Sequence, residues 1–600
     1  MRNFINKNFY LALFIITIIT LNNSFAQTNN NSYVFNGESS QLYVLDGQPV
    51  NTDANQNGFK FFNSNTSNKQ ITVQAWVFPI GDTPAGVEIP VVYRTVNNGK
   101  TFSLYLKDNK AYFSVGNNNT MTVSTSILPA FQWLAISGTY DGSKVKIYSG
   151  GSLVASANFN ITTGYASTIG VTGLFVGKSN SGSYRGLIDE IRIFNTALSA
   201  NNINNSGGNG NPAENFPSSL APYLYGRWSF TEFSYYSGTK ALNDLSIYKN
   251  HLRVFNIDEI LKSKNPPLFV VNSTGDGSDM NPGDGIAVAS NGLTTLRAAI
   301  QEANALTGHQ PIYFYIPGTA PYIIQPESVL PSITEQVSLN ATTQKGYLGS
   351  PVVQVNGSNG GLTITGGSST MRGLALNNSA GYSLTLSPAG GNIIQSNKIA
   401  GILINSAGNN INGNTVSNSI ANGISINSGA IDNLIGNSSA NNISGNAGYG
   451  ISISSANGNQ ILNNTFGTNG LGGIIISNSS GIVTGNTISG NSGFGLTLNS
   501  GTGSQISNNT IGTNTSGGVS ISNGGGNLNG NIITENTGLG ILVNASTGNQ
   551  ITNNTVSSNT SGGISLSNSS VTLTSNSIAG NFGSGVALDS SNGNTLTGNS

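Results

Sequence analysis

The segment Gly485–Asn514, with the sequence GNTISGNSGFGLTLNSGTGSQISNNTIGTN, decides the fold of the C-terminal part of the chain. It is uncharged and consists mostly of Asn, Gly, Ser and Thr, a composition found both in disordered segments and in ordered repeats. Its periodicity indicates order. Glycines that precede short alternations of apolar and small polar residues recur from Gly450 to Gly585 at spacings that alternate between 23 and 22 residues. Each alternation, such as Gly495-Leu496-Thr497-Leu498, predicts a short strand with one buried face.

Asparagine recurs with the same period, in two series that predict the corners of a solenoid. In a stack of parallel strands each turn lies about 4.8 Å above the last, so identical side-chain amides can hydrogen-bond from turn to turn. Asn and Gly also tolerate the left-handed backbone of tight corners. The sequence therefore predicts a parallel β-helix with 22 to 23 residues and two or three short strands in each turn. The two series are Asn464, Asn486, Asn509, Asn531, Asn554 and Asn576, and Asn446, Asn469, Asn491, Asn514, Asn536, Asn559 and Asn581.

These repeats, over residues 346–600, resemble the right-handed parallel β-helix of secreted bacterial surface proteins and polysaccharide-degrading enzymes. The resemblance implies either a scaffold or an enzyme that uses paired carboxylates, or a basic residue beside Asp-bound calcium. Glycoside cleavage usually needs two carboxyl groups within about 5 to 10 Å of each other. Asp432, Glu535 and Asp589 fall on turns too far apart for this. We therefore expect no catalytic residue in the repeats, and we interpret these acids, with Arg372 and Lys398, as solvated loop charges.

Two other kinds of binding surface are disfavoured for the repeats. Sugar rings usually stack on aromatic side chains, but this region has no Trp and has Tyr only at positions 347, 382 and 449. A regular array of threonines could bind ice or another crystal, but the outward positions of the glycine-led strands are mixed. Those positions are Ser452, Ile475, Thr497, Ser520, Leu542, Ser565 and Ala587.

Residues 266–345 differ in composition and contain one clear helical pattern. In TLRAAIQEANAL, positions 296, 299, 300 and 303 are apolar and fall on one helix face, and Gly308 follows as a stop signal. We expect this helix to cover the open strand edge at the start of the solenoid. The segment resembles the N-terminal capping segment of secreted bacterial β-helix proteins with a Leu-Arg-Glu-Ala-Ile motif, except that Ala298 stands where Glu is usual. Asp276, Asp279 and Asp284 could bind calcium, although ordinary turns are the favoured interpretation.

Residues 32–203 carry most of the aromatic residues and a strand-and-turn rhythm typical of β-sandwiches. Four segments follow one another: ITVQAWVFP (71–79), FSLYL (102–106), WLAISGTYDGSKVKIYSGGSLVAS (133–156) and GLIDEIRIFNTALSANNI (186–203). In this order they resemble the LamG-like jelly-roll domain of the concanavalin A-like superfamily. Ser149-Gly150-Gly151 stands where that family usually has an Asn-Gly or Asp-Gly turn, but Gly pairs also turn hairpins. The resemblance implies a domain that binds glycans or proteins, often with calcium, and is rarely catalytic.

Two places in this domain are candidate calcium sites. Asp189 and Glu190 match a signature of the family, but a structural role is favoured, because carboxylates at strand starts often accept hydrogen bonds from turns. Asp53, Asn55 and Asn57 lie in DANQNG, which has the opening of a calcium loop. The twelfth position of that loop is Ser64 instead of the usual bidentate Glu, so a plain surface loop is the favoured interpretation there.

The N-terminus predicts export. Arg2 and Lys7 precede an apolar run from Leu11 to Leu21, which is followed by Ser24-Phe25-Ala26. This pattern is typical of a secretory signal peptide, with cleavage near Ala26. The run is shorter than the roughly 20 residues of a membrane-spanning helix, and no later stretch is long enough. A net charge of zero leaves no basic stripe for nucleic acid, and the absence of cysteine excludes disulfides and thiol catalysis.

The chain is therefore expected to be all-β: a jelly-roll domain at 32–203, a linker and joining strands at 204–265, a cap at 266–345 and β-helix repeats at 346–600. We expect a monomeric, secreted or cell-surface adhesion protein whose first domain binds extracellular polysaccharide or a surface protein. The alternative is a β-helix polysaccharide lyase or glycoside hydrolase with its active site outside these residues. Because Asn599 continues the ladder without a cap, we also expect the natural protein to continue, with a secretion or anchoring domain as in type IX secretion cargo.

Overall fold

The computed structural model describes residues 32–36, 41–45, 70–79, 83, 86–96, 99–116, 120–128, 133–161, 173–179, 182–205, 217–229, 233–236, 239–246, 251–255, 259–261, 269–357, 360–377 and 380–600. The chain divides into two compact units, Met1–Pro266 and Pro267–Ser600, which we call the head and the solenoid. The predicted signal peptide lies outside the described residues. Within the described ranges, no helix is both long and apolar enough to cross a membrane.

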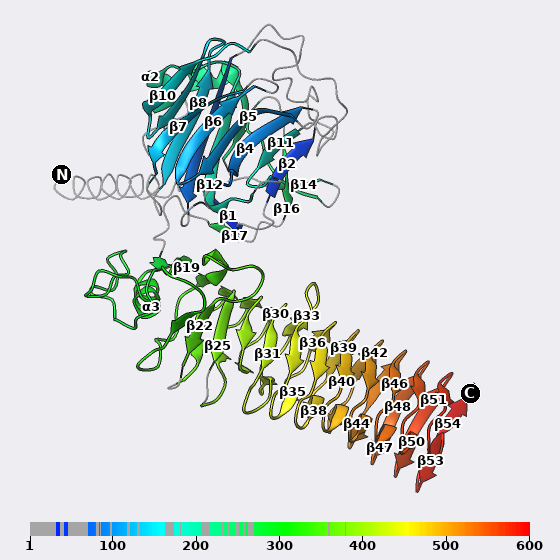
Figure 1. Ribbon diagram of the computed structural model, residues 1–600. Coiled ribbons are helices and arrows are strands. Elements are labelled where there is room, and N and C mark those ends of the chain that lie inside the picture. The colour runs from blue at the N-terminus through cyan, green and yellow to red at the C-terminus, as the bar shows by residue number, and fades with distance from the viewer. Residues whose placement is uncertain are drawn as a thin grey trace, which may run out of the picture. The chain divides into compact units, whose positions relative to one another are not determined.

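Two antiparallel sheets form the sandwich of the head (Figure 1). Among the described residues sheet A has eight strands, in the order β10-β9-β8-β3-β12-β1-β17 with β13 also paired to β12, and sheet B has nine, in the order β14-β15-β16-β2-β11-β4-β5-β6-β7. The strands of sheet A are β1 (Ser32–Asn36), β3 (Ile71–Pro79), β8 (Leu134–Tyr140), β9 (Lys144–Ser149), β10 (Ser152–Asn158), β12 (Arg185–Phe194), β13 (Leu224–Trp228) and β17 (Glu259–Leu261). The strands of sheet B are β2 (Gln41–Leu45), β4 (Ile89–Val96), β5 (Gly99–Lys107), β6 (Lys110–Val115), β7 (Met121–Ile127), β11 (Gly173–Val176), β14 (Phe233–Tyr236), β15 (Thr239–Leu242) and β16 (Leu252–Phe255). Short helices α2 (Ala200–Ile203) and η2 (Ser218–Tyr223) lie between strands.

Alternating side chains build the core of the head between the two sheets. In β6, Ala111, Phe113 and Val115 are buried, whereas the residues between them are half-buried. This is the pattern of a strand with one face on the core. The β9–β10 hairpin turns at Gly150 and Gly151, whose φ angles of 55° and 79° are those of a two-residue hairpin turn, as the Gly pair predicted.

The sandwich extends beyond residue 203, where the sequence placed its end. Strand β13 pairs with β12, β14–β16 continue sheet B beside β2, and β17 pairs with β1. The segment interpreted as joining strands therefore completes both sheets. Strands β1 and β2 pair on one side with β12 and β11, and β17 and β16 give each of them a second neighbour.

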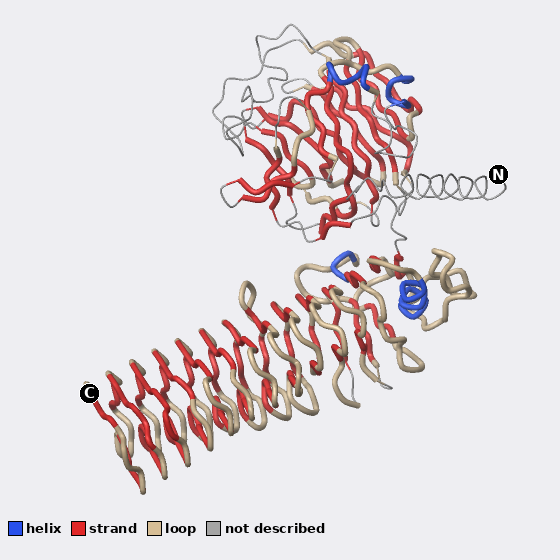
Figure 2. Tube along the Cα trace, turned by 180° about the vertical axis from the view of Figure 1, so that it is seen from behind, coloured by secondary structure: helices blue, strands red, loops and turns tan. Residues whose placement is uncertain are grey.

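Three parallel sheets form the solenoid, and from β21 to β53 each turn contributes one strand to each sheet (Figures 1 and 2). Sheet C contains β18 (Phe269–Val271), β19 (Gln310–Phe314), β21 (Val337–Asn340), β24 (Thr370–Arg372), β27 (Ile393–Gln395), β30 (Asn410–Asn412), β33 (Leu434–Gly436), β36 (Asn459–Leu462), β39 (Gly481–Thr484), β42 (Ser504–Ser507), β45 (Gly526–Asn529), β48 (Thr547–Thr552), β51 (Ser570–Thr574) and β54 (Thr595–Thr597). Sheet D contains β20 (Tyr322–Ile324), β22 (Val353–Asn356), β25 (Leu374–Asn377), β28 (Lys398–Ile399), β31 (Thr415–Ser417), β34 (Asn442–Ser444), β37 (Thr465–Gly467), β40 (Thr487–Ser489), β43 (Thr510–Gly512), β46 (Ile532–Thr534), β49 (Thr555–Ser557) and β52 (Ser577–Ala579). Sheet E contains β23 (Leu362–Ile364), β26 (Leu384–Leu386), β29 (Ile402–Ile404), β32 (Ile424–Ile426), β35 (Tyr449–Ser454), β38 (Gly472–Ser477), β41 (Phe494–Asn499), β44 (Gly517–Ser522), β47 (Leu539–Asn544), β50 (Gly562–Ser567) and β53 (Val586–Asp589).

The strand register confirms the predicted repeat. Thr487 lies beside Thr510, and Thr510 beside Ile532, so successive turns have 23 and 22 residues. Earlier turns are less regular, since Lys398 pairs with Thr415 and Thr415 with Asn442. The inward residues of all three sheets form one continuous apolar core. The solenoid is therefore stabilised by strand pairing between adjacent turns and by the packing of aliphatic side chains in its interior.

Both asparagine series form ladders of side chains that are buried except at Asn581, which is part-buried. The Oδ1 of Asn509 accepts hydrogen bonds from the backbone N–H and the side-chain Nδ2 of Asn486, at 2.9 and 3.0 Å. The Nδ2 of Asn509 in turn donates to the Oδ1 of Asn531 and to the carbonyl oxygen of Val483, both at 2.9 Å. Each amide thus satisfies main-chain groups at a corner and binds the next turn, as the sequence predicted.

The left-handed residues of these corners are the neighbours of the ladder asparagines. The ladder asparagines do not have positive φ; the residue just before each of them does, as at Asn508 (φ 54°) and Thr513 (φ 54°). The ladder side chain must point into the solenoid to bond the asparagine amides of the neighbouring turns. The left-handed bend of the chain is therefore at the residue before it. Glu535 occupies such a corner, with φ 58°.

Helix α3 (Leu296–Ala305) forms where the sequence predicted it, and Figure 2 shows it beside the first turns of the solenoid. The side-chain oxygen of its N-cap, Thr295, accepts a hydrogen bond from the N–H of Ala298 at 3.0 Å. Its apolar face, including Ile300, belongs to the solenoid core beside β18 and β19. Its role as an end cap stays a prediction. A second short helix, η3 (Ala341–Thr343), follows β21.

A bulky residue and a glycine alternate at the start of the sheet E strands, which explains why the full repeat takes two turns. Phe494 lies beside Gly517 in the adjacent turn, and Gly517 beside Leu539. A Cβ atom on Gly517 would lie 2.5 Å from Cε1 of Phe494. Gly517 also has φ +145°, a conformation that side chains rarely adopt. The ring therefore fills the space above a residue that must be glycine.

We expect Asn509→Ala to destabilise the solenoid by about 3 kcal/mol, because it leaves buried main-chain groups without partners, at about 1 to 3 kcal/mol each. The measurement is the denaturant midpoint of the circular dichroism transition. Tryptophan fluorescence reports the head separately, since all three tryptophans lie there. The matched control is Asn529→Ala, an exposed side chain that bonds only Thr552 and Asn553 and should change stability by less than about 0.5 kcal/mol. Equal effects of the two substitutions would contradict the role of the ladder.

Gly517→Ala should lower the same midpoint by the equivalent of about 3 kcal/mol, because the new methyl group overlaps the Phe494 ring and the backbone is strained. Gly503→Ala separates the two causes. Gly503 has φ +81°, but no atom lies within 4 Å of the place that its methyl group would take, so backbone strain alone, about 1 kcal/mol, is expected there. A Gly517 variant no less stable than the Gly503 variant would show that the Phe494 ring and the Leu539 carbonyl oxygen, 2.7 Å from the added Cβ atom, both shift without cost.

Candidate functional site

Asp189 and Glu190 lie in β12, at an irregularity in its pairing with β3. Glu190 has φ 44° and a fully buried side chain. Its carboxylate accepts from Nε of Arg192 at 2.9 Å and from Nη2 of Arg227 in β13 at 2.8 Å. A buried carboxylate needs such partners, because an unpaired charge in the core is strongly destabilising. Glu190 therefore holds β12 and β13 together.

Asp189 has a different environment. Its Oδ1 accepts from the backbone N–H of Glu190 at 2.7 Å, the kind of local carboxylate bond that the sequence favoured. Burial raises the pKa of its carboxyl well above the ordinary value of 3.8, and the neighbouring charge of Glu190 raises it further. Arg192 lies over the ring of Trp76, 4.9 Å from its centroid. The cluster is a buried network of ion pairs and hydrogen bonds.

The calcium predictions have no further support from the geometry. Among the described residues, no group of three or more His, Asp or Glu side chains is placed to hold a metal ion. Asp53, Asn55 and Asn57 lie outside the described residues, so calcium binding there stays a prediction, as it does at Asp189 and Glu190.

The three aspartates at the start of the solenoid have local partners. Asp276 forms an ion pair with Arg297 of α3 at 2.8 Å. Asp279 accepts from the N–H of Val288, and Asp284 from the N–H of Ile286. The acids of the repeats lie on different turns: Asp432 precedes β33, Glu535 follows β46 and Asp589 ends β53. The structure brings none of these three together.

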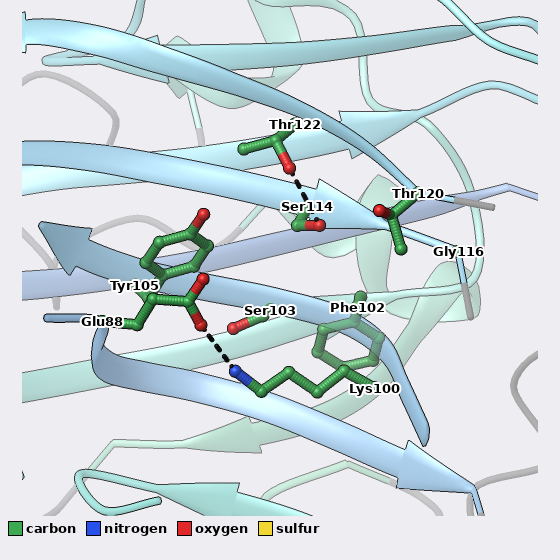
Figure 3. A pocket seen from close by; sticks show the side chains of 9 residues that line it. All are labelled: Glu88, Lys100, Phe102, Ser103, Tyr105, Ser114, Gly116, Thr120 and Thr122. Carbon is green, nitrogen blue, oxygen red and sulfur yellow. Dashed lines mark hydrogen bonds and ion pairs between the residues drawn. The ribbon is translucent and has the colours of Figure 1, made fainter. Parts of the chain in front are cut away.

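A pocket in sheet B of the head gathers polar side chains from neighbouring strands (Figure 3). Its volume is about 270 Å³. Glu88 stands just before β4, and strands β5, β6 and β7 supply most of the rest. The pocket is lined by Glu88, Lys100, Phe102, Ser103, Tyr105, Ser114, Gly116, Thr120 and Thr122.

Three hydroxyl residues of this pocket lie in one row across the sheet. Ser103 of β5 pairs with Ser114 of β6, which pairs with Thr122 of β7. The hydroxyl of Thr122 donates to that of Ser114 at 3.1 Å. Ser103 is 2% exposed, and its Oγ has no hydrogen-bond partner among the described residues. A buried hydroxyl without a protein partner is rare in native structures, so the Ser103 hydroxyl can still form a hydrogen bond.

The pocket lining also contains an ion pair and Tyr105, which stacks on a tyrosine of the next strand. Nζ of Lys100 lies 2.7 Å from Oε2 of Glu88, and both side chains are 37% exposed. Tyr105 stacks on Tyr112, with ring centroids 5.2 Å apart. Burial, with a smaller contribution from the charge of Glu88, raises the pKa of Tyr105 to about 12. Its hydroxyl therefore remains protonated at neutral pH and can donate a hydrogen bond.

This pocket was not predicted from the sequence. The segment FSLYL was interpreted only as a strand, although the alternation places Ser103 and Tyr105 on the face opposite Phe102 and Leu104. That alternation was the available signal, since an outward Ser and Tyr between core residues mark a polar surface. The neighbours of Ser103 depend on strand register, which the sequence did not provide.

We expect Asp189→Asn to make the head more stable than the wild type as pH rises above about 4. The folded state holds the Asp189 proton more tightly than the unfolded state, so its contribution to stability is lost as pH rises through the raised pKa. The measurement is the urea midpoint of tryptophan fluorescence at pH 4, 6 and 8. Asp141→Asn is the control, because the pKa of Asp141 is shifted in the opposite direction. Partial burial raises that pKa, but hydrogen bonds from Ser143 and Lys144 lower it, and the net shift is downward. The prediction would be contradicted if the urea midpoints of the wild type and of the Asp189 variant changed with pH in the same way.

Comparison with known families agrees with both folds expected from the sequence. The model of the concanavalin A-like lectin/glucanases superfamily matches residues 53–204, and the model of the right handed beta helix region matches residues 400–556. The model described as periplasmic copper-binding protein (NosD) matches residues 518–600. No curated protein sequence matches the chain.

Three solved structures illustrate the range of likeness. A putative carbohydrate binding protein from Bacteroides ovatus is 16% identical, with a TM-score of 0.27; the alignment covers 39% of this chain and 61% of that one. Domain 4 of the arabinanase AbnA from Geobacillus stearothermophilus, in complex with arabinotriose, is 23% identical, with a TM-score of 0.20 and coverage of 24% and 68%. The A-module of the mannuronan C-5 epimerase AlgE4 from Azotobacter vinelandii is 17% identical, with a TM-score of 0.34 and coverage of 51% and 94%.

With TM-scores this low, none of these structures identifies what the chain binds. The family matches and the strand order nevertheless agree on the two halves. The chain joins a domain of the concanavalin A-like lectin and glucanase superfamily to a right-handed parallel β-helix.

Proposed function

We propose that this is an exported carbohydrate-binding surface protein, in which the head binds a saccharide in the sheet B pocket and the solenoid is a non-catalytic stalk. The observation that carries the proposal is the hydroxyl of Ser103, which is buried in the pocket without a hydrogen-bond partner among the described residues. An unpaired buried hydroxyl costs about 1 to 3 kcal/mol, and a ligand hydroxyl in the pocket would offset that cost.

The lining suits a saccharide better than other small ligands. Ser103, Tyr105, Ser114, Thr120 and Thr122 provide hydroxyl groups that both donate and accept. The Glu88–Lys100 pair adds one charged acceptor and one charged donor with no net charge. A sugar presents many neutral hydroxyl groups and few other features, and such a set can satisfy them.

Export and the fold of the head support the same function. The N-terminal pattern favours secretion, and the concanavalin A-like fold is one that includes lectins. The match to a copper-binding family does not extend the proposal to copper. Residues 518–600 contain no His, Cys or Met, the side chains that copper prefers.

The test is binding of the mature chain, residues 27–600, to an array of neutral and acidic glycans, with calcium and with chelator. We expect binding by the wild type, and dependence on calcium would support the Asp53 loop as a metal site. Absence of binding to every glycan in both conditions would contradict the proposal.

Ser103→Ala should weaken saccharide binding about 5- to 10-fold in calorimetry and leave the head as stable as before or slightly more stable, because it removes an unpaired polar group. The matched control is Ser137→Ala in sheet A. Ser137 is equally buried, but its hydroxyl accepts a hydrogen bond from Gln74 at 3.1 Å. Its loss should destabilise the head by about 1 kcal/mol and leave binding unchanged. The reverse pattern would place the ligand elsewhere.

A further inference from the structure

We propose that the Glu88–Lys100 ion pair makes this pocket selective for a neutral terminal sugar with two adjacent free hydroxyl groups and excludes uronic acids. This inference rests on the proposed function and names the class of its ligand. The pair lies in the pocket lining and is part-exposed, so a ligand can reach both charged groups (Figure 3).

The geometry of the pair matches a sugar diol. The Lys100 nitrogen and the Glu88 oxygen are 2.7 Å apart, about the separation of two neighbouring hydroxyl oxygens on a pyranose ring. One hydroxyl can donate to the carboxylate while its neighbour accepts from the ammonium group. Such charge-assisted hydrogen bonds are roughly twice as strong as neutral ones. The ion pair does not need to break for this to happen.

Both charged groups are held in place before a ligand arrives. Glu88 is anchored by the start of β4 and Lys100 by the start of β5, and these strands pair with each other. Nζ of Lys100 also lies 5.7 Å from the ring centroid of Tyr93, close enough for a cation–π interaction. A preorganised pair loses little conformational freedom on binding, which favours affinity.

The size of the pocket indicates one sugar residue. A volume of about 270 Å³ is at or below the lower end of the range for drug-sized ligands. A single ring can contact the ion pair while other hydroxyl groups reach the row of Ser103, Ser114 and Thr122. The sugar residue most easily accommodated is the terminal residue of a saccharide, because its adjacent hydroxyl groups are not used in glycosidic linkages.

The charges of the lining disfavour a uronate. Glu88 and Lys100 neutralise each other, so the lining offers no unpaired cation to a sugar carboxylate. A carboxylate in this small space would lie close to that of Glu88, and like charges at short range are destabilising. The charge of Glu88 extends into the pocket, since it contributes to the raised pKa of Tyr105.

The test compares three pairs of trisaccharides, and the two members of a pair differ only at C6 of the terminal non-reducing residue. That residue is galactose or galacturonic acid in the first pair, glucose or glucuronic acid in the second, and mannose or mannuronic acid in the third. Binding to the mature chain and to its Glu88→Gln variant is measured by calorimetry. For the sugar that binds, we expect the wild type to prefer the neutral member at least tenfold. In Glu88→Gln, affinity for the neutral member should fall about tenfold and affinity for the uronate should rise about tenfold.

Asp141→Asn is the control for loss of one negative charge. Asp141, in the turn between β8 and β9, forms a part-exposed ion pair with Lys146 of β9, 3.7 Å apart, and its substitution should leave both affinities unchanged. Thermal melting followed by tryptophan fluorescence checks that each variant is folded. Equal or tighter binding of uronates by the wild type, or an unchanged preference in Glu88→Gln, would overturn this inference while leaving saccharide binding intact. Absence of binding to all six probes, together with a silent array, would overturn the proposed function itself.

Discussion

The solenoid depends on one interaction, the hydrogen bonding of asparagine amides inside its corners. At the two corners of each turn that carry the asparagine series the chain turns sharply, and its main-chain groups cannot all bond to the neighbouring strands. The buried amide supplies both a donor and an acceptor at that point, and it bonds the amide of the next turn as well. Because satisfying buried polar groups outweighs the cost of burying the amide, a side chain that is usually exposed can be fully buried here.

Periodicity explains why the solenoid was predictable in detail. A residue that occupies the same position in every turn, such as Asn486 and Asn509, recurs at the spacing of the turn, so the architecture can be read from spacing alone. The displacement of the left-handed residue to Asn508 was not predictable in the same way. It follows from the direction in which the Asn509 side chain must point, which is a property of the folded corner.

The head was predictable in class but not in its contacts. Its alternating strands favoured a sandwich, yet the pairing of β17 with β1 joins segments that lie more than 200 residues apart, and no local pattern reports such a distance. The pocket has the same origin. Ser103 obtains its neighbours Ser114 and Thr122 from two further strands, and its lack of a partner is visible only once all surrounding groups are placed. The two carboxylates Glu190 and Glu88 illustrate the contrast: the first is buried and bonded to two arginines, and the second is part-exposed and bonded to one lysine.

The alternation of Phe494, Gly517 and Leu539 on sheet E also bears on how such a solenoid changes length. Removal of one turn would bring two large side chains, or two glycines, into adjacent turns, with a steric clash in one case and an uncovered backbone in the other. Removal or duplication of two turns, 45 residues, restores the sequence of large and small. Insertions and deletions tolerated in evolution or in engineering should therefore occur in units of two turns, so that the length of the solenoid is adjustable only in steps of about 10 Å.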